Sequence, residues 1–200
     1  MVCFVERNRG GLVRRREMIH PVVLPDQYHQ VAYVEATSYS SYVDTGYVPN
    51  QDTRVCITIQ RMSESEFAVA YGTESPRFSL IKNRVDYGVN IGISIPEMTL
   101  AEKYRVDHNK NMIRIEENSY KISGYPQFTA SKPLYLFILN GFMRATTQFL
   151  GRIYSCKIYE NDILQRNFVP CIRKEDYVLG FYDPVTKKFY PGKGTFSYGE

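Results

Sequence analysis

Short stretches of alternating apolar and polar residues follow one another from about Val31 to the end of the chain. In Thr53–Gln60, the apolar residues Val55, Ile57 and Ile59 fall on one side of an extended chain and polar residues fall on the other. A repeat of two residues is typical of a half-buried β-strand. The same repeat predicts further strands over Lys103–Asp107, Met112–Glu116, Ile153–Tyr159 and Ile163–Val169, with Tyr104, Val106, Ile113, Ile115 and Ile158 facing inward.

Polar turns connect these segments. The run His108–Asn111 predicts a hairpin, and Glu160–Asp162 predicts a second one. Leu134–Leu139 is continuously apolar, which predicts a central strand covered on both faces, with Leu136 inside. No stretch carries a long helical repeat. Many short strands with turns between them predict an all-β domain, an antiparallel sandwich or barrel.

Composition supports this interpretation. A length of 200 residues suits one all-β domain, and 17 Tyr and 11 Phe without any Trp favour strands over helices. The four cysteines form no CxxC pair and no zinc-type spacing with histidine. We expect reduced thiols near the core, with disulfides as the alternative. The cysteines are Cys3, Cys56, Cys156 and Cys171.

Residues 1–30 differ from residues 31–200, which we assign to the β-domain. The first 20 residues hold five Arg and two Glu, whereas the rest of the chain is nearly neutral. This basic, glycine-broken segment predicts an extended arm that attaches to a partner surface, the alternative being a solvated terminus. The anchoring residues would be Arg9, Leu12, Val13, Arg14, Arg15, Arg16, Met18 and Ile19.

The charge distribution and the hydropathy also argue against two kinds of partner, nucleic acids and membranes. A neutral body lacks the basic face that phosphate neutralisation requires, so we expect no specific nucleic-acid binding. Met1 is followed by no signal-like hydrophobic run, and no apolar stretch approaches membrane-spanning length. We therefore expect synthesis in the cytoplasm without membrane insertion.

The sequence carries no recognisable catalytic pattern, so we expect a non-enzymatic protein without a cofactor. His20, His29 and His108 have no neighbouring nucleophile or metal-ligand pattern, and we expect all three at the surface. There is no nucleophile elbow and no P-loop. The acidic pairs at Glu64–Glu66 and Glu116–Glu117 fall in a connection and at a strand end, so no acid and nucleophile pair is expected on one sheet face.

Two kinds of binding site remain open. Asp44, Asp52 and Asp183 lie near strand ends, but they form no DxD cluster, so a calcium site is unsupported and we expect no metal. A second site could bind sugars, because aromatic faces next to polar side chains suit sugar rings. Its residues would be Tyr39, Tyr42 and Tyr47, with sheet-surface or core packing as the alternative.

Several ordered blocks of the sequence resemble a laminin G-like, concanavalin A-like jelly-roll family. That family occurs in tail and other virion proteins of bacteriophages and in bacterial surface proteins. The blocks span residues 31–197, with a looser middle. They are Tyr33–Thr37, Tyr42–Asn50, Thr53–Val55, Phe149–Tyr159, Arg166–Cys171, Gly180–Asp183, Lys188–Tyr190 and Gly194–Phe196.

The resemblance implies a two-sheet jelly-roll sandwich and, for function, a virion structural or accessory protein that the arm anchors to the particle. Its partners would then be other virion proteins and further copies of itself, and its location the virion. The alternative that the resemblance leaves open is a lectin-like adhesin domain that binds cell-surface glycans. Fold by itself does not decide between these functions.

Overall fold

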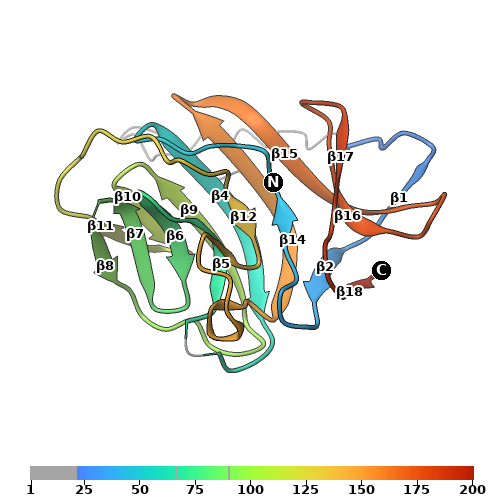
Figure 1. Ribbon diagram of the computed structural model, residues 1–200, viewed down its shortest axis with the longest axis horizontal. Helices are drawn as coiled ribbons and strands as arrows, with labels where there is room; N and C mark the ends of the chain where they lie inside the picture. Colours follow the sequence, from blue (N-terminus) through green and yellow to red (C-terminus); the bar gives the residue numbers. More distant parts are fainter. Residues whose placement is uncertain (1–21, 66, 90) are drawn as a thin grey trace, which may run out of the picture.

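The computed structural model describes residues 22–65, 67–89 and 91–200 and shows two β-sheets packed into a sandwich (Figure 1). Neighbouring strands are antiparallel except for one parallel pair, β13 with β5. The described residues contain one short 3-10 turn, Ala145–Thr147, and no α-helix. The expected all-β jelly-roll sandwich is confirmed.

The larger sheet has 11 strands. Its path runs β11 (Asn118–Lys121), β10 (Met112–Ile115), β9 (Lys103–Asn109), β4 (Thr53–Arg61), β14 (Gly151–Glu160), β15 (Ile163–Arg173), β16 (Leu179–Asp183) and β17 (Lys188–Pro191). Three further strands join this path: β1 (Tyr28–Gln30) pairs with β15, and β2 (Tyr33–Ala36) pairs with both β14 and β18 (Phe196–Gly199). Strand β1 consists of residues that the sequence pattern assigns to the arm.

The smaller sheet has seven strands. Its path runs β3 (Val43–Asp44), β12 (Tyr135–Leu136), β5 (Val69–Thr73), β6 (Arg77–Ile81), β7 (Arg84–Gly88) and β8 (Gly92–Ser94), and β13 (Leu139–Asn140) pairs with β5. Strands β6–β8 lie at one end of the molecule, and β16, β17 and β1 lie at the other (Figure 1).

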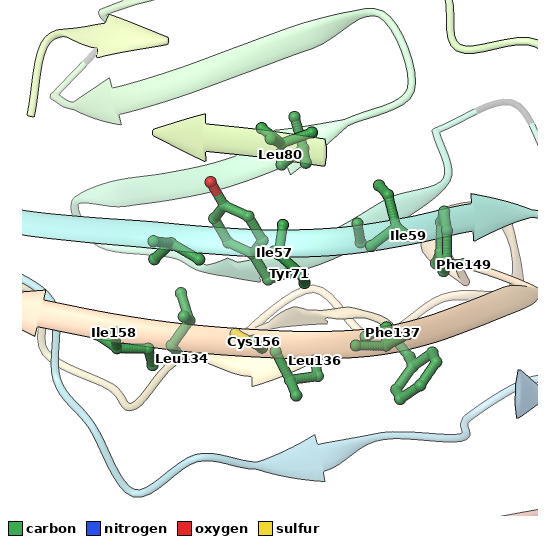
Figure 2. Close-up of a cluster of buried hydrophobic side chains, with 14 of the residues drawn as sticks. Ile57, Ile59, Tyr71, Leu80, Leu134, Leu136, Phe137, Phe149, Cys156 and Ile158 are labelled. Carbon is green, nitrogen blue, oxygen red and sulfur yellow. The ribbon is translucent and has the colours of Figure 1, made fainter. Parts of the chain in front are cut away.

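The core lies between the sheets and consists of the inward-facing half of each strand. Ile57 and Ile59 of β4 and Ile158 of β14 meet Tyr71 and Leu80 of the smaller sheet (Figure 2). Of the residues expected inside, all are buried except Tyr104, which is partly buried against the core. The period of two therefore predicts these inward-facing side chains correctly, while β4 also buries Cys56 and Thr58 on its other face.

His108 corrects an expectation. The sequence pattern places it in a surface turn, but β9 continues through Asn109, so His108 lies on the inward face two residues after Val106 and is fully buried. Its ring stacks on Phe78 with centroids 4.4 Å apart, and its Nδ1 is hydrogen-bonded to the Tyr71 hydroxyl at 2.9 Å. Burial lowers the pKa of His108 to about 3, because the charged ring would lose its hydration.

The apolar run Leu134–Leu139 is not one continuous strand, which also corrects an expectation. Phe137 adopts a left-handed conformation with φ of 71°, and this breaks the run between β12 and β13. Most of the run is still buried, and its backbone groups at Phe137 find partners there. The Phe137 amide donates to the Ala70 carbonyl, and the Phe137 carbonyl accepts from the Phe149 amide. A run of apolar residues reports burial, but it does not by itself report extended geometry.

The cysteines divide into two kinds. Cys156 and Cys171 are buried free thiols, as expected. Burial raises the pKa of the Cys171 thiol to about 12, which keeps it protonated and unreactive. Cys56 is disulfide-bonded, so the expectation of reduced thiols is wrong for this residue. Within the described ranges, no helix is long and apolar enough to cross a membrane.

Candidate functional site

The three tyrosines expected to bind sugar do not gather at one place. Tyr39 is exposed, and Tyr42 is half-buried with its ring stacked on Tyr135 at 4.6 Å between centroids. Tyr47 is buried, and its hydroxyl is hydrogen-bonded to Thr53 and Glu160. The Tyr47 ring therefore presents no open face to a ligand. The expected anchoring residues of the arm, Arg9, Leu12, Val13, Arg14, Arg15, Arg16, Met18 and Ile19, lie outside the described residues.

The aspartates considered for calcium lie apart, and each already accepts hydrogen bonds from the protein. Asp44 accepts from the Gly46 amide at 2.8 Å, and Asp183 accepts from the Thr186 hydroxyl at 2.7 Å. Asp52 accepts from the Tyr125 hydroxyl at 2.8 Å. Among the described side chains, no group of three or more His, Cys, Asp or Glu is arranged to hold a metal ion.

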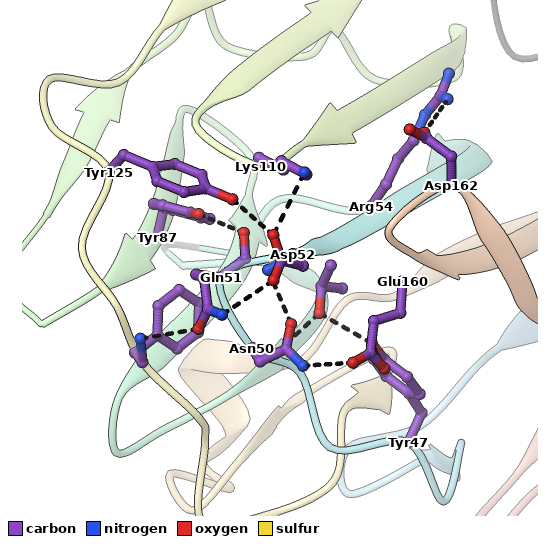
Figure 3. Close-up of polar contacts among 12 residues, drawn as sticks. Tyr47, Asn50, Gln51, Asp52, Arg54, Tyr87, Lys110, Tyr125, Glu160 and Asp162 are labelled. Carbon is purple, nitrogen blue, oxygen red and sulfur yellow. Dashed lines mark hydrogen bonds and ion pairs between the residues drawn. The ribbon is translucent and has the colours of Figure 1, made fainter.

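Tyr47 and Asp52 belong to a polar network that lies where β4 begins and β14 ends, which we call the edge network (Figure 3). It begins at a turn in which the Asn50 side chain accepts from the Asp52 amide at 2.8 Å. Asn50 also donates to Glu160 at 2.9 Å, which ties this turn to β14. The members of the edge network are Tyr47, Asn50, Gln51, Asp52, Thr53, Tyr87, Lys110, Tyr125 and Glu160.

Electrostatics in the edge network follow from these internal contacts. The Tyr125 hydroxyl and the Lys110 ammonium, 3.3 Å away, hold the pKa of Asp52 below its usual value. Burial is the main cause that raises the pKa of Tyr47 to about 12. The donors and acceptors of this cluster point at one another, so the edge network fixes a strand connection and leaves little capacity for a ligand.

A second polar feature is a pocket on the smaller sheet. It has a volume of about 580 Å³, within the range of small-molecule sites. Four charged side chains, Glu74, Arg77, Arg84 and Asp86, line it together with Ser75, Pro76, Gly88, Val89 and Ile91. Their elements are the β5–β6 turn, β6, β7 and the β7–β8 connection. We call this the charged pocket.

Strand register brings the charged residues together. Ser79 of β6 lies opposite Asp86 of β7, and Asp86 lies opposite Gly92 of β8. The Ser79 hydroxyl donates to Asp86 at 2.9 Å. A Cβ at position 92 would lie 2.5 Å from Asp86 Oδ1 and 2.8 Å from Arg84 Nη2, so glycine is required beside this pair.

Ion pairs orient the two arginines. Arg84 Nε donates to Asp86 Oδ1 at 2.6 Å, and Arg77 Nη2 donates to Glu74 Oε1 at 2.7 Å. Arg77 Nη1 also lies 3.8 Å from Asp86 Oδ2. Glu74 is held in place because its amide donates to the Asn140 carbonyl at 2.9 Å. The result is a set of planar donors and acceptors fixed side by side, with the guanidinium groups more exposed than the carboxylates.

This arrangement suits recognition of hydroxyl-rich molecules. Carboxylates accept hydrogen bonds and guanidinium groups donate them, whereas each hydroxyl of a sugar can do both. Two adjacent hydroxyls can therefore bridge an Asp and Arg pair. Two carboxylates line the pocket, Glu74 from the β5–β6 turn and Asp86 from β7.

No sequence motif marks this pocket. Glu74 and Asp86 are separated by most of a hairpin, and neither stands in a motif. The nearest usable signal is the alternation in Arg84–Gly88, where Val85 and Tyr87 face the core and Arg84 and Asp86 therefore face outward. Alternation places Asp86 on the outer face, but it does not place Glu74 beside it.

Comparison with solved structures supports the fold. A crystal structure from Bacteroides ovatus ATCC 8483, described as a candidate carbohydrate binding protein, is similar with a TM-score of 0.53 and 10% sequence identity. The similarity covers 86% of this chain and 61% of that one, so this chain spans less than two thirds of its neighbour. At this identity the likeness shows the fold alone. No family model and no curated protein matches the chain, so the laminin G-like assignment stays a prediction.

Proposed function

We propose that this protein is a non-enzymatic, glycan-binding β-sandwich module and that the charged pocket is its binding site. The observation that carries the proposal is the fixed alternation of Glu74, Arg77, Arg84 and Asp86 around one open pocket. The description of the Bacteroides neighbour as a candidate carbohydrate binding protein points the same way.

Binding is favoured over hydrolysis by the state of the two carboxylates. A glycosidase needs one carboxyl group free to donate a proton to the leaving oxygen. In the charged pocket, each carboxylate accepts from a guanidinium group at 2.7 Å or less. Such carboxylates serve as fixed acceptors, and we propose that they hold the ligand without cleaving it.

The test is a glycan array followed by calorimetric titration of the strongest ligand. We expect Asp86→Asn to reduce affinity at least tenfold, because the substitution removes the charge that orients Arg84. The control is Asp176→Asn, since Asp176 also pairs with an arginine, accepting from Nε and Nη2 of Arg173, but lies between β15 and β16 of the larger sheet. Absence of any bound glycan, or equal affinity in both variants, would overturn the proposal.

The setting in which the module is displayed is a separate proposal that rests on the sequence blocks. We infer that the module belongs to a bacteriophage particle, with residues 1–30 as its anchor. Mass spectrometry of purified particles tests this placement directly. Deletion of residues 1–24 should abolish incorporation while leaving the β-domain folded, and retained incorporation would contradict the anchor.

A further inference from the structure

The charged pocket exposes its cations more than its anions. The side chains of Arg77 and Arg84 are 42% and 46% exposed, whereas those of Glu74 and Asp86 are 23% and 4% exposed. The formal charges of these four residues sum to zero, but the two carboxylates are buried more deeply than the two guanidinium groups. A ligand entering from solvent therefore meets cationic donors first.

Arg84 has unused hydrogen-bonding capacity. Its Nε is occupied by Asp86, but Nη1 and Nη2 donate to none of the described residues. Because a guanidinium group has five N–H donors in a rigid plane, about four remain for a ligand. The free end forms a fork that matches the two oxygens of a carboxylate, or two oxygens of a sulfate or phosphate group.

The orientation of this fork is fixed before any ligand arrives. Asp86 is held from one side by the Ser79 hydroxyl at 2.9 Å and holds Arg84 Nε at 2.6 Å. A guanidinium group anchored in this way loses less conformational freedom on binding than a free surface arginine. Arg77 is anchored similarly by Glu74, so both donors are preorganised.

Lys132 lies near Glu74 but is not part of the pocket lining. A Cβ at Gly141 would lie 3.2 Å from Lys132 Nζ and 3.5 Å from Glu74 Oε2, so the ammonium and carboxylate groups are neighbours. Each acid of the pocket lining pairs with one arginine, so the preference for an anion comes from the greater exposure of the two guanidinium groups.

We propose that the glycans selected by the charged pocket are acidic ones, whose carboxylate, sulfate or phosphate group is bound by the Arg84 fork. This inference rests on the proposed function and narrows it to a substrate class. The sugar hydroxyls would pair with the more exposed acceptor, Glu74, and the acidic group would pair with Arg84. Arg84 is thus the specificity-determining residue.

The experiment compares oligosaccharides that differ only in charge. Trigalacturonate and its carboxyl-reduced neutral counterpart provide one pair, and a sulfated oligosaccharide with its desulfated form provides another. We expect each acidic member to bind at least tenfold more tightly at low ionic strength. We also expect 0.5 M salt to weaken acidic binding and to leave neutral binding unchanged, because exposed charges are screened.

Variants make the test specific to the pocket. Arg84→Gln should remove the preference for the acidic member while retaining weak neutral binding. The control is Arg105→Gln, since Arg105 is a comparably exposed arginine that pairs with Glu116 on the larger sheet. Equal binding of both members by the native protein would overturn this inference and leave the proposed function intact. Binding of neither member, nor of any glycan on the array, would overturn the proposed function itself.

Discussion

The edge network and the charged pocket are built from the same kinds of side chain, yet they differ in how fully their hydrogen-bonding groups are paired within the protein. In the edge network, Glu160 accepts from Tyr47 and Asn50, and Asp52 accepts from Tyr125, Lys110 and Gln51. In the charged pocket, Arg84 is hydrogen-bonded to the described residues through Nε alone, and its side chain is 46% exposed. Satisfied polar clusters determine structure, whereas partly satisfied and preorganised ones can bind.

His108 is a core residue whose neighbours contact both clusters. It follows Asp107, which pairs with Arg54, and it stacks on Phe78, which precedes the Ser79 that donates to Asp86. Destabilisation of the core at His108 should therefore unfold both clusters.

The largest expected effect is acid destabilisation through His108. The folded ring has a pKa of about 3, against about 6.5 for an unfolded histidine. Below pH 6.5 His108 binds a proton in the unfolded chain but stays neutral in the folded protein. The free energy of unfolding therefore falls by about 1.4 kcal/mol per pH unit down to pH 3. Above pH 6.5 both forms are neutral and the contribution vanishes.

Denaturant unfolding between pH 7.5 and 4.5 measures this effect. His108→Phe keeps the stack on Phe78 but cannot take a proton, so its stability should fall less steeply than that of the native protein. The substitution also leaves the Tyr71 hydroxyl without its partner, which should lower stability at neutral pH. Parallel pH profiles for the two proteins would contradict the assignment.

A smaller effect is expected from Gly92→Ala, which disturbs the pocket alone. The added methyl group would collide with Asp86, Arg84 and the Val85 carbonyl. Overpacking of this kind costs about 1–3 kcal/mol. Calorimetry should also show at least a tenfold loss of glycan affinity, whereas Ser94→Ala on the same strand should retain it. Native affinity in Gly92→Ala would show that the pair need not keep its geometry.

Tyr47→Phe should act only on stability. It removes the hydroxyl that is bonded to Thr53 and Glu160, at a cost of about 1 kcal/mol. Glycan affinity should not change, because the proposed binding site is the charged pocket. Tyr39→Phe is the control for stability, since Tyr39 is exposed. Loss of glycan binding in Tyr47→Phe would move the binding site to the edge network.

The smallest effect is expected from Arg105→Gln. Arg105 and Glu116 form an exposed pair at 3.2 Å on the larger sheet, and such pairs contribute little. Thermal unfolding should place the change in stability within about 0.5 kcal/mol. A larger change would mean that this pair resembles the edge network more than a surface contact.

The sequence determined the strands and the inward face of most of them. Alternation with a period of two depends only on neighbouring residues, because successive side chains of an extended chain point to opposite sides. For this reason the pattern alone predicts Val55, Ile57, Ile59 and Ile158 as core residues, and all four are buried. The sandwich fold follows from the repetition of such strands.

Tertiary structure decided what local patterns do not encode. Strand β9 extends through Asn109 and so carries His108 into the core, and the left-handed Phe137 divides an apolar run into two strands. The charged pocket depends on register between β6, β7 and β8 and on a turn that brings Glu74 to Arg77. Register is a relation between strands and not a property of any one of them, so the sequence predicted strands of the right kind but could not predict the site that they form.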